Sequence, residues 1–212
     1  WPDGAITVRY HFRHALCQHT LYRRIGLAHR TRWHRQLGEH FIKVYGEDTR
    51  EIAGELAVHF ERGRDYQRAL LFRQQAGEHA LKKNTYRKVL GHGQAGLDLL
   101  TQLPATEDHR PLELRLRQLV SAALEMLQGF TDDEVEDNLR RAQQLCRELE
   151  DVPTLVAMVI SLARMQLYRA NRPALEELIR QEEDLVERSH DPLLLVQLHT
   201  QLVSIETLRG RH

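Results

Sequence analysis

The stretch IAGELAVHFERGRDYQRALLFRQQAGEHA, residues 52–80, decides the fold. Its apolar residues recur every three or four positions, which is the spacing of one face of an α-helix. The pattern stops at Gly63-Arg64-Asp65 and restarts at Tyr66, and alanines on both sides of this turn allow two helices to approach closely. Two helices of this length joined by a short turn form the unit of helical repeat proteins.

Helical periodicity continues through most of the chain. Apolar positions predict further helices over 86–103, 116–127 and 135–149, the last opened by a capping box at Thr131–Glu134. Prolines at positions 111, 153 and 192 begin helices about 40 residues apart, the length of two helices and their turns. We therefore predict an all-α fold of about ten helices. Its architecture would be a right-handed superhelical array of antiparallel pairs resembling tetratricopeptide (TPR) repeats.

The two ends of the chain differ from the repeats. Residues Ala5–Tyr10 alternate apolar and polar side chains after an Asp-Gly turn, which predicts a strand. A single strand cannot satisfy its backbone alone, so we expect its partner upstream of Trp1. Helices are expected over 14–25 and 29–45. Residues 1–46 would thus precede TPR-like repeats at 47–212, whose last helix, at 193–208, lacks a following partner within the sequence.

Composition excludes several classes of protein. The 212 residues are 42% hydrophobic and 28% charged with zero net charge, so no general attraction to nucleic acid is implied. Charge is unevenly distributed, because residues 1–45 hold eight Arg and Lys against two acids, whereas residues 107–190 hold eleven Arg against eighteen acids. Cys17 and Cys146 cannot form a disulfide framework. With no secretory leader and no membrane-spanning apolar run, the expected location is the cytoplasm.

Gly91-His92-Gly93-Gln94-Ala95-Gly96 spells the GxGxxG motif of dinucleotide-binding proteins. Such a site requires the motif between a strand and a helix, where backbone amides meet the pyrophosphate. Here the glycines fall within a helical pattern that begins at Tyr86, so the motif predicts close helix packing instead. No phosphate-binding P-loop and no hydrolase motif occurs in the sequence. We therefore expect no catalytic residues, no cofactor and no enzymatic activity in this chain.

The segment YHFRHALCQHT, residues 10–20, places three histidines close to Cys17. On a helix only His14 and Cys17 share a face, and a closed metal site needs three or four converging ligands. We therefore predict no metal at this cluster. Arginines interleaved with Tyr22 and Trp33 leave a second interpretation open, in which the basic segment before residue 46 binds nucleic acid.

The same segment resembles a junction in STAND-class signalling ATPases, multidomain AAA-like proteins. The resemblance rests on Tyr10-x-Phe12-Arg13-His14-Ala15-Leu16, Tyr22, Arg30-x-Arg32 and His34, and then on Gly63-Arg64-Asp65-Tyr66-x-x-Ala69-Leu70, Ala76-Gly77-Glu78-x-Ala80 and Leu97-x-Leu99-Leu100-x-x-Leu103-Pro104. It implies that Ala5–Tyr10 is the last strand of a winged helix and that TPR-like repeats follow. The likeness covers about residues 5–104.

This resemblance implies a non-catalytic sensor or adaptor region of a larger signal-transduction ATPase or transcription regulator, lacking the NTPase module. The expected partner is a protein, the parent's own NTPase module or a small-molecule effector, and no membrane is involved. The alternative is a nucleic-acid-binding module that uses the basic, winged-helix-like N-terminus. Strong salt dependence of DNA binding would favour this alternative.

Stacked helix pairs expose one side of each first helix along a concave surface. If residues 112–128, 154–169 and 193–208 form first helices, their non-core positions recur three or four residues apart. Most of these side chains are small or amide-bearing and can hydrogen-bond a partner at low desolvation cost. The predicted binding positions are Gln118, Ser121, Glu125, Ser161, Arg164, Gln197, Thr200 and Ser204.

Overall fold

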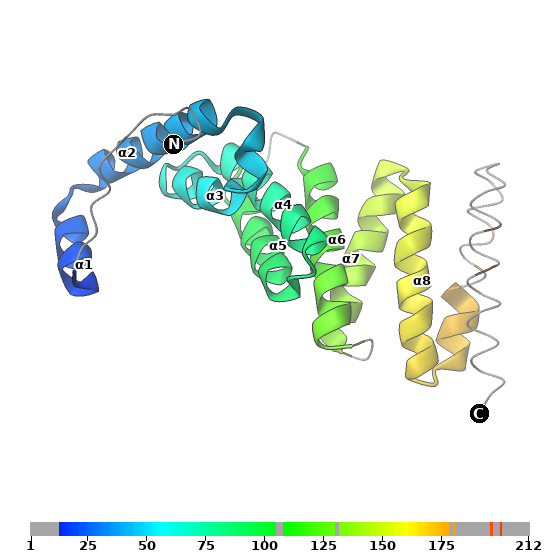
Figure 1. The fold of residues 1–212 in the computed structure, drawn as a ribbon. Coiled ribbons are helices and arrows are strands. Elements are labelled where there is room, and N and C mark those ends of the chain that lie inside the picture. The colour runs from blue at the N-terminus through cyan, green and yellow to red at the C-terminus, as the bar shows by residue number, and fades with distance from the viewer. Residues whose placement is uncertain are drawn as a thin grey trace. The chain divides into compact units, whose positions relative to one another are not determined.

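The computed structural model describes residues 13–104, 108–129 and 132–178, and the single positions 180, 196 and 200. Within these residues all regular structure is helical (Figure 1), and successive helices from α2 to α5 and from α6 to α8 pack on one another in a TPR-like arrangement, which confirms the all-α fold class. The predicted strand Ala5–Tyr10 and most of the predicted helix at 193–208 lie outside the described residues.

The chain divides into two compact units, Trp1–Glu107 and Asp108–His212. This division was not anticipated from the sequence. The expected boundary after residue 46 stays a prediction, because it separates the repeats from a segment that is only partly described. In the first unit the elements are α1 (Ala15–Arg24), α2 (Leu27–Tyr45), the 3-10 helix η1 (Gly46–Arg50), α3 (Ala53–Arg62), α4 (Tyr66–Lys82) and α5 (Tyr86–Leu100).

The hairpin of α3 and α4 is the centre of the first unit. Phe60 and Phe72 stack with their ring centroids 5.5 Å apart, and Leu56 and Leu70 are fully buried around them. The turn ends at Asp65, whose carboxylate accepts a hydrogen bond from the backbone N–H of Arg68 at 3.2 Å and caps α4. The stretch that predicted a helical hairpin therefore forms one, with its alanines in the contact.

Helix α2 packs across α3 through two close approaches. A Cβ on Gly38 would lie 2.9 Å from Cζ of Phe60, so only glycine leaves room for the buried ring. One turn earlier in α2, a Cβ on Gly63 would lie 3.1 Å from the backbone nitrogen of Arg35. Position 38 thus meets position 60 and position 35 meets position 63. Because the numbers run in opposite directions, the two helices are antiparallel.

The second unit contains α6 (Arg110–Leu127), α7 (Asp133–Leu149) and α8 (Val152–Tyr168), and residues 172–178 are helical. Pro111 and Pro153 lie in the first turns of α6 and α8, as their positions predicted. The N-cap of α7 is Asp132, whose side chain accepts from the N–H of Glu134 at 2.8 Å. The predicted helix start is therefore confirmed, while Thr131 of the expected capping box lies outside the described residues.

Leucine, valine and alanine side chains of α6, α7 and α8 form the core of the second unit, and Cys146 is buried among them. Among the described residues of this unit, four polar side chains are also buried, namely Ser121, Asn138, Gln143 and Gln166. Asn138 of α7 is 6% exposed and donates to Oγ of Ser121 at 2.7 Å and to the carbonyl of Arg117 at 3.0 Å. Every helix in the described part of the chain is too short or too polar to cross a lipid bilayer.

Candidate interaction surfaces

Five predicted binding positions lie on α6 and α8. Glu125, Ser161 and Arg164 are half-buried, and their role in binding stays a prediction. Gln118 is also half-buried, and its amide donates to Oγ1 of Thr154 at 3.4 Å, which connects α6 to the start of α8. Its hydrogen-bonding capacity is therefore already used in part within the unit.

Ser121 is a correction. The sequence pattern placed it on the exposed side of α6, but it is 3% exposed and accepts the hydrogen bond from Asn138. The reason is that α7 brings a buried amide to this face, so a small hydroxyl is the partner that satisfies it. Thr200 is exposed and its hydroxyl donates to the carbonyl of Val196 at 2.7 Å. Gln197 and Ser204 lie outside the described residues.

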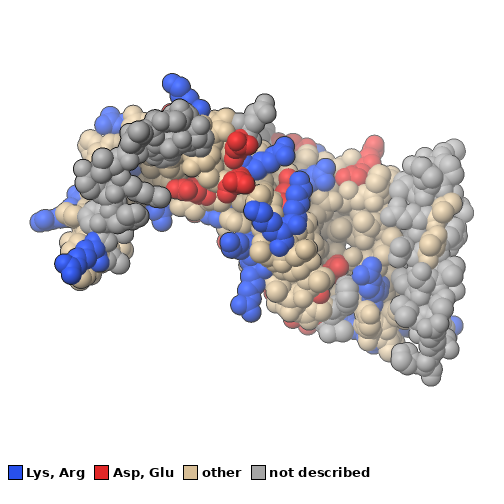
Figure 2. Space-filling view, in the orientation of Figure 1, with Lys and Arg blue, Asp and Glu red and all other residues tan. Residues whose placement is uncertain are grey.

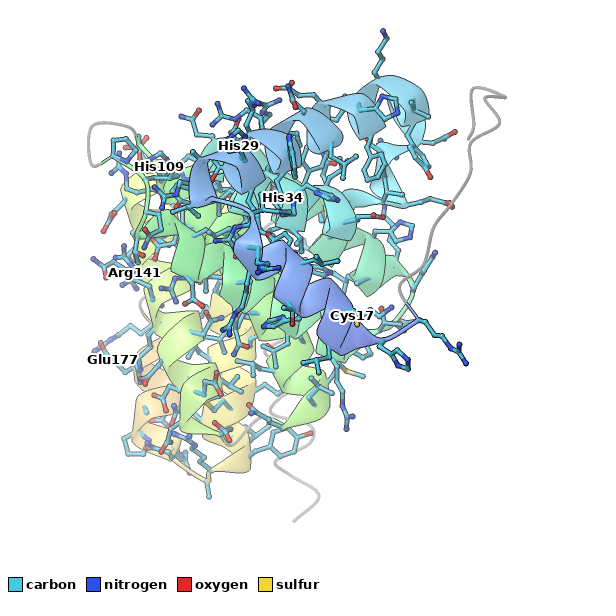
Figure 3. All side chains as sticks on the ribbon, turned by 90° about the vertical axis from the view of Figure 1, so that its left-hand side faces the viewer. Cys17, His29, His34, His109, Arg141 and Glu177 are labelled. Carbon is cyan, nitrogen blue, oxygen red and sulfur yellow. The ribbon has the colours of Figure 1, made fainter. Side chains whose placement is uncertain are left out.

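The GxGxxG sequence lies within α5, as predicted, and Gly93 and Gly96 are buried. These two glycines therefore serve helix packing, whereas Gly91 is exposed. Among the described residues no three His, Cys, Asp or Glu side chains converge as metal ligands, and Cys17 on α1 is exposed. Figure 3 shows Cys17 on α1, and His29 and His34 on α2. The absence of a metal stays a prediction, since His11 is not among the described residues.

Two histidines instead form a structural network that connects three helices. Nε2 of His34 lies 2.7 Å from the hydroxyl of Tyr22 on α1, and its Nδ1 lies 3.0 Å from Nδ1 of His59 on α3. Burial, the adjacent His59 and nearby arginine charges lower the pKa of His34 below 6.5. Burial and the charge of Arg62 likewise lower the pKa of His59. Both rings are therefore held neutral, and the imidazoles support packing.

A cavity with polar and charged lining residues lies between η1, α3, α4 and α5 and has a volume of about 320 Å³. The lining side chains from α4 and α5 recur three or four residues apart, so each of these helices turns one of its faces to the cavity. We call it the charged basin. Its lining residues are Arg50, Glu51, Ile52, Gly54, Glu55, Ala76, His79, Ala80, Lys83, Thr85, Lys88 and His92.

Opposite charges occupy different elements around the charged basin. Lys83 follows α4 and Lys88 belongs to α5, whereas Glu55 belongs to α3 and Glu51 lies between η1 and α3, next to Arg50 of η1. Figure 2 shows Lys and Arg side chains over α4 and α5 in the middle of the view and acidic side chains over the adjoining α3. This separation suits a ligand that carries both signs of charge, with its acidic groups against the lysines.

His92 adds a fixed hydrogen-bond donor to the charged basin. Its Nδ1 lies 3.4 Å from a guanidinium nitrogen of Arg73, which can only donate, so Nδ1 is the acceptor and Nε2 carries the proton. Burial, Arg73 and Lys88 lower the pKa of His92 and keep the ring neutral. Gly54 leaves space for the ring, since a Cβ there would lie 3.2 Å from its Cε1.

Comparisons with known proteins show the fold alone. No family model and no curated protein sequence matches the chain. Among solved structures, it is similar to the crystal structure of aspartyl phosphate phosphatase F from Bacillus subtilis, with a TM-score of 0.58 and 11% sequence identity. The alignment covers 87% of this chain and 47% of that one, so the chain spans about half of its length. The comparisons add no sequence evidence for a STAND-class parent.

The charged basin was missed by reasoning from the sequence. That reasoning looked for ligand positions in α6 and α8, whereas the basin lies in the first unit. One signal was available. Thr85, Lys88 and His92 follow a helical spacing on the face of α5 that faces the α3–α4 hairpin, and this hairpin was predicted correctly.

Proposed function

We propose that this chain is a non-catalytic protein-interaction module that binds a segment of mixed charge from a protein partner in the charged basin. The observation that carries the proposal is the separation of Lys83 and Lys88 from Glu51 and Glu55 across one cavity of a helical repeat. Helical repeats present extended surfaces of this kind to partners. Binding alone changes no covalent bond in the partner. The proposed role is therefore regulatory, because binding can change only where the partner lies or which conformation it adopts.

We further propose that the module belongs to a larger STAND-class signalling ATPase, where the partner is the parent's own NTPase module or a separate regulator. The support is the resemblance of residues 5–104, in which the hairpin of α3 and α4 occupies the place of the first repeat. A small-molecule effector is a second kind of ligand for the charged basin, since about 320 Å³ is within the range of small-molecule sites.

A nucleic-acid-binding role is the rival proposal, and the basic side chains of α1 and α2 favour it. Arg23, Arg24 and Arg32 are exposed in this region. Phosphate binding by several such side chains would make affinity fall steeply with salt concentration, by roughly one logarithmic unit per contact for each tenfold increase in salt. The salt dependence of binding to a duplex therefore separates the two proposals.

The test is selection of displayed 12-residue peptides against the full chain, followed by binding measurements on matched variants. Lys83→Ala/Lys88→Ala removes the lysines of the charged basin. Lys82→Ala/Arg87→Ala removes the same number of exposed cations from neighbouring positions that do not line the cavity.

We expect selected peptides to carry acidic and basic residues together and to lose affinity about tenfold for the first variant only, because two partly exposed ion pairs contribute about that much. Equal binding to both variants would contradict the proposal. So would recovery of peptides without acidic residues, or tight duplex binding with a steep salt dependence.

A further inference from the structure

A second surface of the first unit lies where α2 passes the turn between α3 and α4. Two adjoining cavities share Arg35 and Arg64, and their volumes are about 580 and 350 Å³. The larger cavity is lined by Leu27, Ala28, Thr31, Arg32, Arg35 and Arg64. The smaller one continues past Asp65 and Tyr66 to residues 102–104 after α5. We call the two cavities together the arginine groove.

The register of α2 on α3 explains why this groove is open. Positions 38 and 35 of α2 meet positions 60 and 63, so α3 ends at the level of Arg35. The face of α2 that is buried at Gly38 continues toward the N-terminus through Thr31 and Leu27, seven and eleven residues earlier, with no helix of the hairpin beneath it. Leu27 is accordingly 55% exposed although it lies on the packing face.

The groove carries positive charge at both edges. Arg32 and Arg35 come from α2 and Arg64 comes from the turn, and none of the described residues that line the larger cavity is acidic. Among the described residues neither Arg32 nor Arg64 forms an ion pair with an acid, whereas Arg35 donates to the carbonyl of Gly63 at 3.2 Å. Arg64 has φ of 55°, a left-handed conformation that costs a non-glycine residue free energy.

We propose that the arginine groove binds an acidic amphipathic helix of a protein partner. Its apolar side chains would cover Leu27 and Ala28, and its carboxylates would pair with the three arginines. Charge complementarity selects this occupant, because a basic groove with an apolar helical face requires a ligand with both properties. The proposal is independent of the charged basin, which shares no lining residue with this groove.

Protein is favoured over nucleic acid by the composition of the groove. A phosphate backbone needs a track of cations and gains nothing from Leu27 or Ala28. A helix with acids on one side and leucines on the other satisfies every group that lines the larger cavity.

The probe is a synthetic 18-residue helical peptide with glutamates along one face and leucines along the other. Controls are the same peptide with lysine in place of glutamate, and a 20-base-pair duplex. Binding to the full chain is followed by fluorescence anisotropy at two salt concentrations. The test variant is Arg32→Ala/Arg64→Gly and the matched control is Lys82→Ala/Arg87→Ala, which removes two exposed cations elsewhere in the same unit.

The Arg64→Gly change also separates binding from folding. Glycine adopts a positive φ without strain, so the melting temperature should stay level or rise while the charge is lost. We expect the acidic peptide to bind the test variant about tenfold more weakly and the control variant unchanged, as the loss of two rim charges predicts. Lys83→Ala/Lys88→Ala should leave binding of the acidic peptide unchanged, because neither lysine lines the arginine groove. The result for the arginine groove therefore does not depend on whether the charged basin binds a ligand.

Three results would overturn the proposal. One is equal loss of affinity in both arginine and control variants, which would indicate unspecific attraction. Another is that the duplex binds more tightly than the acidic peptide and loses affinity only in the Arg32→Ala/Arg64→Gly variant. The third is concentration-dependent dimerisation in sedimentation that the same variant abolishes, since the occupant would then be a second copy of this chain.

Discussion

Replacing Asn138 with alanine tests the polar contact in the core of the second unit. Asn138 donates to Oγ of Ser121 at 2.7 Å and to the carbonyl of Arg117 at 3.0 Å. Its side-chain oxygen accepts from the guanidinium of Arg117 at 3.2 Å. The alanine variant removes all three hydrogen bonds and leaves Oγ of Ser121 without the donor that it has in the native core.

The expected cost follows from these three contacts. Each neutral hydrogen bond contributes about 1 kcal/mol net and the one from the charged guanidinium about 2 kcal/mol. The higher helix propensity of alanine returns about 0.6 kcal/mol. We therefore expect Asn138→Ala to lower the free energy of unfolding by about 3 kcal/mol. Ser121→Ala removes only one contact and should cost about 1 kcal/mol.

Because the two residues share one hydrogen bond, the double variant should cost about 1 kcal/mol less than the two single costs together. Urea denaturation gives these free energies, and hydrogen exchange in peptides from α6 and α7 assigns the change to this unit. Gln144→Ala, at an exposed position of the same helix, is the control and should change stability by less than about 0.5 kcal/mol. Strict additivity of the two single changes, or a cost for Asn138→Ala near that of the control, would refute the reasoning.

Three further predictions concern the first unit. Gly38→Ala places a Cβ 2.9 Å from Cζ of the buried Phe60, and we expect a loss of about 1 kcal/mol in urea denaturation because overpacking outweighs the gain in helix propensity. The lowered pKa values of His34 and His59 mean that the unfolded chain binds more protons below pH 6.5. Stability should therefore fall as pH drops below about 6.5 toward the lowered pKa values, and His34→Gln should flatten this slope; a slope that is unchanged in the variant would contradict the assignment. Finally, millimolar ATP should leave the melting temperature unchanged, because Gly91–Gly96 lies inside α5; a clear upward shift would disprove this.

The helices could be predicted because their signals are local. The apolar spacing around Gly63-Arg64-Asp65 fixed the α3–α4 hairpin, and Pro111 and Pro153 marked the starts of α6 and α8. Such signals arise within a few residues, so a single sequence contains them. The glycine motif was likewise placed within a helix from local signals, because a helical pattern begins before it at Tyr86 and no strand precedes it.

The surfaces could not be predicted because they depend on the register between helices. Ser121 was assigned to the surface, since its own helix gives no sign that Asn138, 17 positions later, reaches it. The arginine groove depends on where α3 ends beneath α2, which no spacing within α2 reveals.

The arginines of the arginine groove differ from the ion-paired side chains around Glu113, and this difference favours the groove as a binding surface. In the second unit Glu113 accepts hydrogen bonds from both Arg117 and Arg141. Burial alone would raise the pKa of Glu113, but these two guanidinium groups outweigh it and lower the pKa.

A partner that binds to Glu113, Arg117 or Arg141 must first break the hydrogen bonds between them. The free energy lost in this way cancels most of the free energy gained from the new contact. Arg32 and Arg64 of the first unit, without an acidic partner among the described residues, give up only water. The free energy gained by binding a carboxylate is therefore larger at Arg32 and Arg64 than at Arg117 and Arg141, which are already paired with Glu113.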